Sequence, residues 1–154
     1  MSAYTCLNYH VAFSTKYRKE RINDSFKDDL YSYIGGIIRG ENGCLIEIGG
    51  ASDHIHILAG FSASISVSEM MKRIKGSSSK WVNEEKKTSK RFYWQEGYGA
   101  FTVSQSQVPA IGSYIQTQKE HHKKRTFEEE FILLSNRHGI DYDPKYVFET
   151  EHHG

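Results

Sequence analysis

Four short stretches of the chain are rich in apolar, aromatic and β-branched residues, the pattern typical of β-strands. The first covers residues 4–15, and the last lies around 98–103. Between them, 45–61 contains two apolar runs on either side of Gly-Gly-Ala-Ser-Asp, which predicts a β-hairpin with a longer loop. The chain is therefore expected to contain four strands, of which the middle two are consecutive.

Apolar residues recur at helical spacing in the segments that connect these strands. The first helix is expected to begin at Asn23 or Asp24, either of which offers an N-cap, and to stop at the glycines of 40–43. The second helix can begin at Ser66 or Ser68. A Gly-Ser-Ser-Ser stretch inside this second helix leaves a break or a close contact open.

Two further helices are expected after the fourth strand. One runs from about Gln107 to Lys124, where Pro109 is tolerated because it falls in the first turn. The other runs from Phe127 to His138 and ends before a glycine.

The order strand, helix, strand, strand, helix, strand predicts an α+β protein with a ferredoxin-like split βαβ fold. In this fold a four-stranded antiparallel sheet carries two helices on one face. No internal repeat or linker divides the sequence, so we expect one domain over 1–154, with about 140–154 as an acidic irregular tail.

Composition narrows the class of protein. Apolar residues make up 38% and charged residues 25% of the 154 positions, values ordinary for a soluble protein. No apolar run has the length of a membrane span, and the N-terminus lacks the basic-then-apolar pattern of a signal peptide. Cys6 and Cys44 have no metal-binding or redox spacing, which favours reduced thiols and a cytoplasmic location.

The net charge of +1 conceals an uneven distribution. Basic residues concentrate in 16–21, 72–91 and 119–125, whereas acidic residues dominate after Thr126. Basic clusters with interleaved Tyr, Phe and Trp suit a nucleic-acid surface, where cations meet phosphates and rings stack on bases. Solvated helix faces explain the same charges equally well, so charge alone leaves both interpretations open.

Candidate chemistry begins with two histidines on the second strand of the hairpin. Side chains two apart on a strand point to the same face, so His54 and His56 project together while Ile55 and Ile57 face the other way. Two imidazoles on one rigid strand are a ready pair of ligands for a divalent cation. Such a pair alone is more often incidental than metal-binding, so other residues must support it.

The helix expected over 107–124 has a polar stripe beside its apolar one. Tyr114, Gln118 and His121 stand at i, i+4 and i+7, which brings a phenol and an amide to one arc of the helix. The amide oxygen of Gln118 is a possible metal ligand beside the phenol. A plain helix surface, with the tyrosine resting on its neighbours, is the alternative interpretation.

Five segments in order carry a resemblance to a known family. They are Leu-Asn-Tyr-His-Val-Ala-Phe-Ser-Thr-Lys-Tyr-Arg (7–18), Gly-Gly-Ala-Ser-Asp-His-Ile-His-Ile-Leu (49–58), Ile-Lys-Gly-Ser-Ser-Ser-Lys-Trp (74–81), Trp-Gln-Glu-Gly-Tyr-Gly-Ala-Phe-Thr-Val-Ser (94–104) and Tyr-Ile-Gln-Thr-Gln (114–118). Through them the chain resembles the single-tyrosine HUH transposases. These small enzymes move bacterial insertion sequences as single-stranded DNA, and they include repeat-associated tyrosine transposases.

The resemblance implies a division of roles within the site. Tyr114, on a C-terminal catalytic helix, matches the nucleophile, and His54, His56 and Gln118 match the ligands of a Mg²⁺ or Mn²⁺ ion. The implied reaction cuts single-stranded DNA through a 5′-phosphotyrosine intermediate, frees a 3′-hydroxyl and allows rejoining without ATP. The implied location is the cytoplasm of a bacterial or archaeal cell.

The implied substrate is single-stranded DNA with hairpins at the ends of an element. Asp53 is a candidate for orienting an imidazole, or it completes the turn, and His121 is a candidate neighbour of the site. The family forms homodimers with merged sheets, in which the catalytic helix can serve the partner's histidines. Backbone contacts to DNA are expected from seven basic residues, Lys16, Arg18, Arg21, Lys72, Lys75, Lys80 and Arg91.

Two other functions compete with the transposase. A non-catalytic or domesticated hairpin-binding protein acting on chromosomal repeats would keep the fold, although intact His54, His56, Tyr114 and Gln118 argue against loss of cleavage. An unrelated metal hydrolase would need a further carboxylate or histidine ligand, and none stands out in the sequence.

Overall fold

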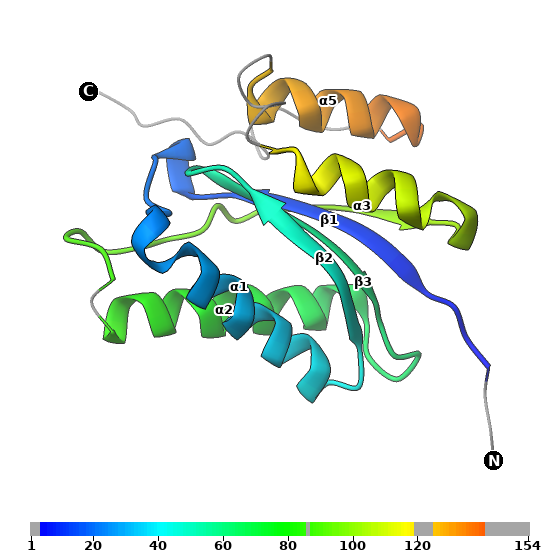
Figure 1. The fold of residues 1–154 in the computed structure, drawn as a ribbon, viewed down its shortest axis with the longest axis horizontal. Coiled ribbons are helices and arrows are strands. Elements are labelled where there is room, and N and C mark those ends of the chain that lie inside the picture. The colour runs from blue at the N-terminus through cyan, green and yellow to red at the C-terminus, as the bar shows by residue number, and fades with distance from the viewer. Residues whose placement is uncertain (1–3, 86, 119–124, 141–154) are drawn as a thin grey trace.

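The computed structural model describes residues 4–85, 87–118 and 125–140, which form one antiparallel sheet with helices on both faces (Figure 1). The sheet has the strand order β2-β3-β1-β4, and every neighbouring pair is antiparallel. This arrangement confirms the predicted ferredoxin-like α+β fold. The strands are β1 (Asn8–Ser14), β2 (Cys44–Gly50), β3 (His54–Gly60) and β4 (Gly99–Val103).

Two helices cover each face of the sheet in Figure 1, with α1 and α2 on one side and α3 and α5 on the other. The α-helices are α1 (Asp24–Gly40), α2 (Val67–Glu84), α3 (Val108–Gln116) and α5 (Phe127–Arg137). Short 3-10 helices, η1 (Lys16–Arg18) and η2 (Gln105–Gln107), follow β1 and β4. The pair expected on one face corresponds to α1 and α2.

The main apolar core lies between the sheet and the α1–α2 pair. Val11 and Phe13 of β1 and Ile55 and Ile57 of β3 are fully buried there, because alternate residues of a strand share a face. Burying an apolar side chain of this size contributes about 1.5–3 kcal/mol. The period-two pattern of these strands therefore fixes which face of the sheet receives the first two helices.

Helix α2 begins where its sequence predicts and runs without a break. The side chain of Ser66 accepts a hydrogen bond from the backbone N–H of Glu69, a standard N-cap. Within the Gly-Ser-Ser-Ser stretch, Ser78 is buried and accepts a hydrogen bond from Trp94 Nε1 at 2.9 Å. Of the two outcomes left open by the sequence, the structure has the close contact.

On the opposite face, glycines allow the helices to approach the sheet closely. A Cβ at Gly49 of β2 would lie 2.5 Å from the backbone oxygen of Ile115 in α3. A Cβ at Gly99 of β4 would lie 2.9 Å from the ring of Phe131 in α5. Both distances are shorter than van der Waals contact, so a larger residue at either position would push a helix away.

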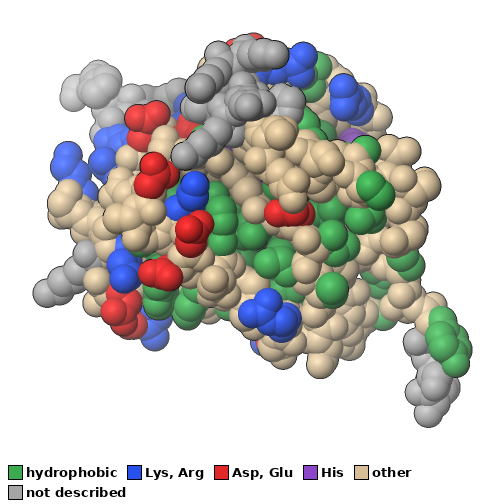
Figure 2. All heavy atoms as spheres, viewed as in Figure 1, with side chains coloured by type: hydrophobic (Ala, Val, Ile, Leu, Met, Phe, Trp, Pro, Cys, Tyr) green, Lys and Arg blue, Asp and Glu red, His purple; other side chains and the backbone are tan. Residues whose placement is uncertain are grey.

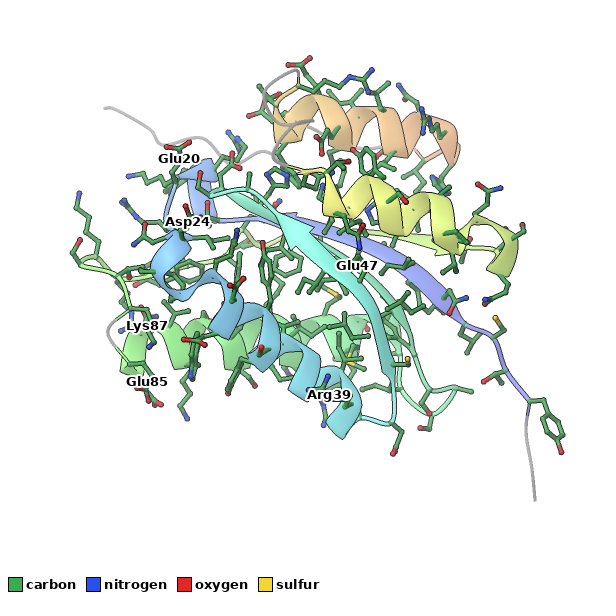
Figure 3. All side chains as sticks on the ribbon, in the orientation of Figure 1. Glu20, Asp24, Arg39, Glu47, Glu85 and Lys87 are labelled. Atoms are coloured by element: carbon green, nitrogen blue, oxygen red, sulfur yellow. The ribbon has the colours of Figure 1, made fainter. Side chains whose placement is uncertain are left out.

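A polar contact also fastens α3 to the edge of the sheet. Glu47 of β2 extends toward α3 (Figure 3) and accepts a hydrogen bond from Gln116 Nε2 at 2.8 Å. Together with Gly49, this contact places the last turn of α3 above the hairpin that carries the two histidines.

The prediction of one unbroken helix over 107–124 is wrong at Thr117, where the helix is interrupted. Helix α3 stops at Gln116, because Thr117 (φ −100°, ψ 22°) leaves the helical conformation, and Gln118 lies just beyond. His121 falls within 119–124, outside the described residues, as does most of the expected tail, 141–154. Among the described residues, no helix is long and apolar enough to cross a membrane.

Candidate metal centre and tyrosine

The two histidines lie on β3, one of the two central strands, and face α3 and α5. Across the sheet, His54 pairs with Ser14 and His56 with Ala12 of β1. Both imidazoles are fully buried. Ile55 turns into the main core on the other side, as the alternation predicts.

A buried acceptor or donor contacts the Nδ1 atom of each imidazole. Asp53 Oδ1 lies 2.7 Å from His54 Nδ1, and His10 Nε2 lies 2.8 Å from His56 Nδ1. These contacts orient both rings so that the Nε2 atoms point toward the helices. Partners of this kind fix the tautomer of metal-binding histidines and raise their basicity.

Oxygen atoms from two other elements meet the Nε2 atoms. Gln118 Oε1 lies 2.9 Å from His54 Nε2. Glu130 Oε2, from α5, lies 3.0 Å from His56 Nε2 and 4.0 Å from His54 Nε2. Ligand atoms of His54, His56 and Glu130 all lie within 4.8 Å of one another, and all three residues are buried. Two imidazoles with amide and carboxylate oxygens are a donor set that fits a divalent cation.

Tyr114 lies in the last turn of α3, beside this cluster. Its ring centroid is 5.8 Å from that of His56 and 6.2 Å from that of His10. Burial, followed by the charge of Glu130, raises the pKa of Tyr114 to about 12, while hydrogen bonding with Gln118 and the charge of Arg125 act in the opposite direction. The phenol is therefore protonated at neutral pH in this arrangement.

The imidazoles differ in how their surroundings affect protonation. Burial lowers the pKa of His54, but hydrogen bonds to Asp53 and Gln118 and the charges of Asp53 and Glu130 outweigh it, and the net shift is upward. Burial, together with the nearby His56 and His138, lowers the pKa of His10 to about 3. His10 is therefore neutral at physiological pH.

A cleft between α3 and α5 opens beside the phenol. Its volume is about 560 Å³, within the range of small-ligand sites. Tyr114, Glu130 and His10 line it, and Arg125 and Arg137 add two guanidinium groups. Guanidinium groups bind phosphate oxygens well, so a nucleotide phosphate is a suitable occupant of this cleft.

A second concave region, which we call the basic groove, lies near η1. It has a volume of about 220 Å³, and it is lined by Lys16, Tyr17, Lys19, Arg21, Lys90, Arg91 and Tyr93. Lys16 and Arg91 each lie within 6 Å of the centre of the Tyr93 ring, at 5.7 Å and 5.8 Å. Lysine and arginine side chains gather, with acidic ones among them, at the left of Figure 2, the side where η1 and the end of α2 lie in Figure 1.

The seven basic residues expected to contact DNA do not form one surface. Lys16, Arg21 and Arg91 line the basic groove, and Lys80 lines a neighbouring groove that shares Arg91 and Tyr93. Arg18 forms an ion pair with Glu128 of α5. The Nζ of Lys75 donates to the backbone oxygens of Glu96 and Gly97, and Lys72 is exposed on α2 outside both grooves.

Two residues of the cluster were missed by sequence reasoning. His10 was not assigned to the site from the sequence, and it is buried with its Nε2 2.8 Å from His56 Nδ1. No further carboxylate stood out in the sequence, but Glu130 reaches the histidines from α5. Glu130 lies on the same helical face as Phe127, Phe131 and Leu134, which marks it as a charged residue in an apolar stripe.

Comparisons with known proteins agree with this arrangement. A family model described as "Transposase IS200 like" matches residues 3–118. The transposases for insertion sequence element IS200 of Salmonella typhimurium and Salmonella typhi are each 30% identical over 120 residues, covering 75% of this chain and 78% of theirs.

Solved structures share the fold. A Deinococcus radiodurans R1 protein described as a transposase superposes with a TM-score of 0.62 at 24% identity, covering 77% of this chain and 95% of its own. A REP-associated tyrosine transposase bound to a REP hairpin gives a TM-score of 0.60 at 14% identity, covering 79% and 74%.

An antiparallel sheet with a His-x-His pair on a central strand, faced by a tyrosine helix, defines the class of single-tyrosine HUH transposases. Within that class, the chain belongs to the IS200-like transposase family.

Proposed function

We propose that this transposase cuts and rejoins single-stranded DNA with Tyr114 as the nucleophile. The phenol oxygen attacks a phosphodiester, a 5′-phosphotyrosine bond forms, and the 3′-oxygen leaves as a hydroxyl. A 3′-hydroxyl attacking the same phosphorus reverses the step and joins strands without ATP. The observation that carries the proposal is the position of Tyr114, which lines the cleft and contacts His56 within one chain.

The residues around Tyr114 are suited to a divalent cation, Mg²⁺ or Mn²⁺. His54 and His56 would bind it through their Nε2 atoms, with Gln118 Oε1 adjacent to His54. When bound, such a cation offsets charge on the phosphoryl group and favours the phenolate. Mixed imidazole and amide ligands suit Mn²⁺ at least as well as Mg²⁺, which prefers oxygen.

The raised pKa of Tyr114 explains why positive charge is needed. With a pKa of about 12, only about one phenol in 10⁴ is ionised at pH 8. Arg125, which lines the same cleft, already lowers this pKa through its charge. Nearby cations would therefore favour proton loss from Tyr114.

We further propose that the substrate contains DNA hairpins, which the basic groove contacts. Lys16, Arg21 and Arg91 would bind backbone phosphates, and the exposed ring of Tyr93 would stack on an unpaired base. A hairpin is what the structurally similar REP-associated transposase binds. Phosphate contacts of this kind set affinity more than sequence choice.

A two-fold dimer is also proposed, on the resemblance to dimeric family members. The Tyr114 ring lies 5.8 Å from that of His56 in its own chain, so the chemistry does not by itself require a site shared between two subunits. Light scattering of the purified protein measures the oligomeric state, and a monomer at all concentrations would exclude the dimer.

Incubation with DNA tests the catalytic proposal. The purified protein is mixed with Mn²⁺ and synthetic single strands that carry the imperfect palindromes flanking its gene. A covalent adduct resistant to denaturation is expected from the native protein and is absent from Tyr114→Phe, which still binds the strand. An adduct of equal yield from Tyr114→Phe would disprove the role of Tyr114. Tight hairpin binding without any adduct would instead support a non-catalytic hairpin-binding protein.

A further inference from the structure

We propose that Glu130 of α5 is a ligand of the cation, so that the centre combines two imidazoles and a carboxylate with the amide of Gln118. The proposal rests on the metal site of the proposed function and adds the residue that supplies its negative charge. Glu130 lies beyond residue 118, where the match to the family model ends. The role is therefore inferred from the geometry of this chain.

The distances around Glu130 correspond to neighbouring ligands of one ion. Two ligands at about 2.1 Å from an octahedral cation are about 3 Å apart when adjacent and about 4.2 Å apart when opposite. Glu130 Oε2 is 3.0 Å from His56 Nε2 and 4.0 Å from His54 Nε2. Gln118 Oε1 is 2.9 Å from His54 Nε2. These atoms therefore need only small shifts to share one ion.

Contacts elsewhere in α5 determine where Glu130 lies. A capping box between Thr126 and Glu129 fixes the first turn of the helix. Phe127 and Phe131 pack with Ala12 of β1, on the face of the sheet that carries the histidines. Glu130, between these two rings in the sequence, is consequently directed at the histidine pair.

A cation would compensate for the burial of the Glu130 carboxylate, beyond its contact with His56. Its side chain is 1% exposed, and removing a carboxylate from water is costly unless a positive charge or a metal compensates. A divalent ion beside His54 and His56 would supply that compensation. One carboxylate against a divalent ion leaves a net positive charge, which the attack on a phosphodiester requires.

The carboxylate also bears on which ion binds. Two imidazoles and one carboxylate form a set typical of transition metals that accept both nitrogen and oxygen. Mg²⁺ prefers a shell of oxygen ligands and keeps several waters. We therefore expect Mn²⁺ to bind more tightly than Mg²⁺, with Glu130 contributing to both affinities through its charge.

The test measures Mn²⁺ binding to the full-length protein without DNA, by the loss of the free-ion electron paramagnetic resonance signal. Glu130→Gln keeps the size of the side chain and removes its charge, and we expect it to weaken Mn²⁺ binding about 10-fold or more. Glu129→Gln is the matched control, because it removes the same charge one residue away, where the side chain is exposed and glutamine still serves a capping box. Glu129→Gln should therefore bind Mn²⁺ as tightly as the native protein does.

Equal affinities of the native protein and Glu130→Gln would overturn the proposal, as would an equal loss in Glu129→Gln. A second measurement needs no variant. In crystals of the native protein soaked with Mn²⁺, the anomalous peak should lie about 2.2 Å from a Glu130 oxygen. A peak bound by His54 and His56 with Glu130 turned away would also overturn it. The Tyr114 adduct is measured independently, so ligation by Glu130 can fail while the proposed function stands.

Discussion

At the residue scale, the site depends on which nitrogen of each histidine meets which neighbour. Asp53 and His10 contact the Nδ1 atoms, so the two Nε2 atoms converge on Gln118 and Glu130. The two imidazoles thus have their orientation fixed from the sheet side, while Gln118 and Glu130 reach them from the helix side. Losing a contact on the sheet side should loosen a ligand without removing it.

Asp53 provides the first prediction. Asp53→Ala removes the acceptor at His54 Nδ1 and should weaken Mn²⁺ binding about 10-fold, since partners of metal-bound histidines commonly contribute 10–100-fold. Asp53→Asn retains an oxygen acceptor and should lose less. Calorimetric Mn²⁺ titration of the three proteins checks the order. Identical affinities would show that Asp53 only completes the turn.

Local patterns in the sequence predict part of this site, and tertiary structure supplies the rest. The alternation along 54–57 places both histidines on one face, and the structure agrees. Tyr114 was assigned through family resemblance, because a tyrosine on a helix surface has no pattern of its own. Glu130 meets His56 only because α5 docks on the same face of the sheet, and no local pattern encodes that docking.

At the element scale, α3 and α5 carry the groups that act on the histidine face. Periodicity in the sequence predicted the four strands and both of these helices. It did not predict the end of α3, because the helical pattern continues past Gln116 in the sequence. Just beyond the turn at Thr117, Gln118 Oε1 lies 2.9 Å from His54 Nε2. The packing of α3 against β2 should therefore affect the proposed cleavage reaction directly.

A pair of glycine substitutions tests how closely α3 packs against β2. Gly49→Ala places a methyl group 2.5 Å from the Ile115 oxygen, so it should lower the free energy of unfolding by about 1–3 kcal/mol and slow adduct formation. Gly112→Ala, on α3 itself, meets no atom within 4 Å and should be neutral or stabilising by up to about 1 kcal/mol. Thermal unfolding and adduct kinetics provide the readouts. Equal effects of the two changes would refute the close approach.

At the scale of the whole molecule, the two faces of the sheet have different roles. One face buries the apolar core under α1 and α2, and the other carries the histidines under α3 and α5. Beside the basic groove, an ion pair joins η1 to α5 on the second face. Arg18, with φ 55°, contacts Glu128, two residues before Glu130. DNA in the groove would thus lie near α5, the helix that carries Glu130.

The salt dependence of DNA binding tests whether the basic groove contacts the DNA. Binding of a single-stranded hairpin should weaken with rising salt, and each lost phosphate contact should reduce the slope of log K against log salt by about 0.7. Arg21→Ala should show this reduction, because Arg21 lines the groove. Arg39→Ala, at the far end of α1 from Asp24 (Figure 3), should leave the slope unchanged. Fluorescence anisotropy over a salt series measures both, and equal slopes for all three proteins would exclude Arg21 from the interface.

The most direct measurement of the central claim is peptide mapping of the covalent adduct. The protein is reacted with a hairpin strand and Mn²⁺, digested with nuclease and trypsin, and analysed by fragmentation mass spectrometry. The tryptic peptide 92–119 contains Tyr93, Tyr98 and Tyr114, so fragmentation can tell the three apart. The account predicts a residual nucleotide linked through its 5′-phosphate to Tyr114. A nucleotide on any other residue, or a 3′-linkage, would contradict it.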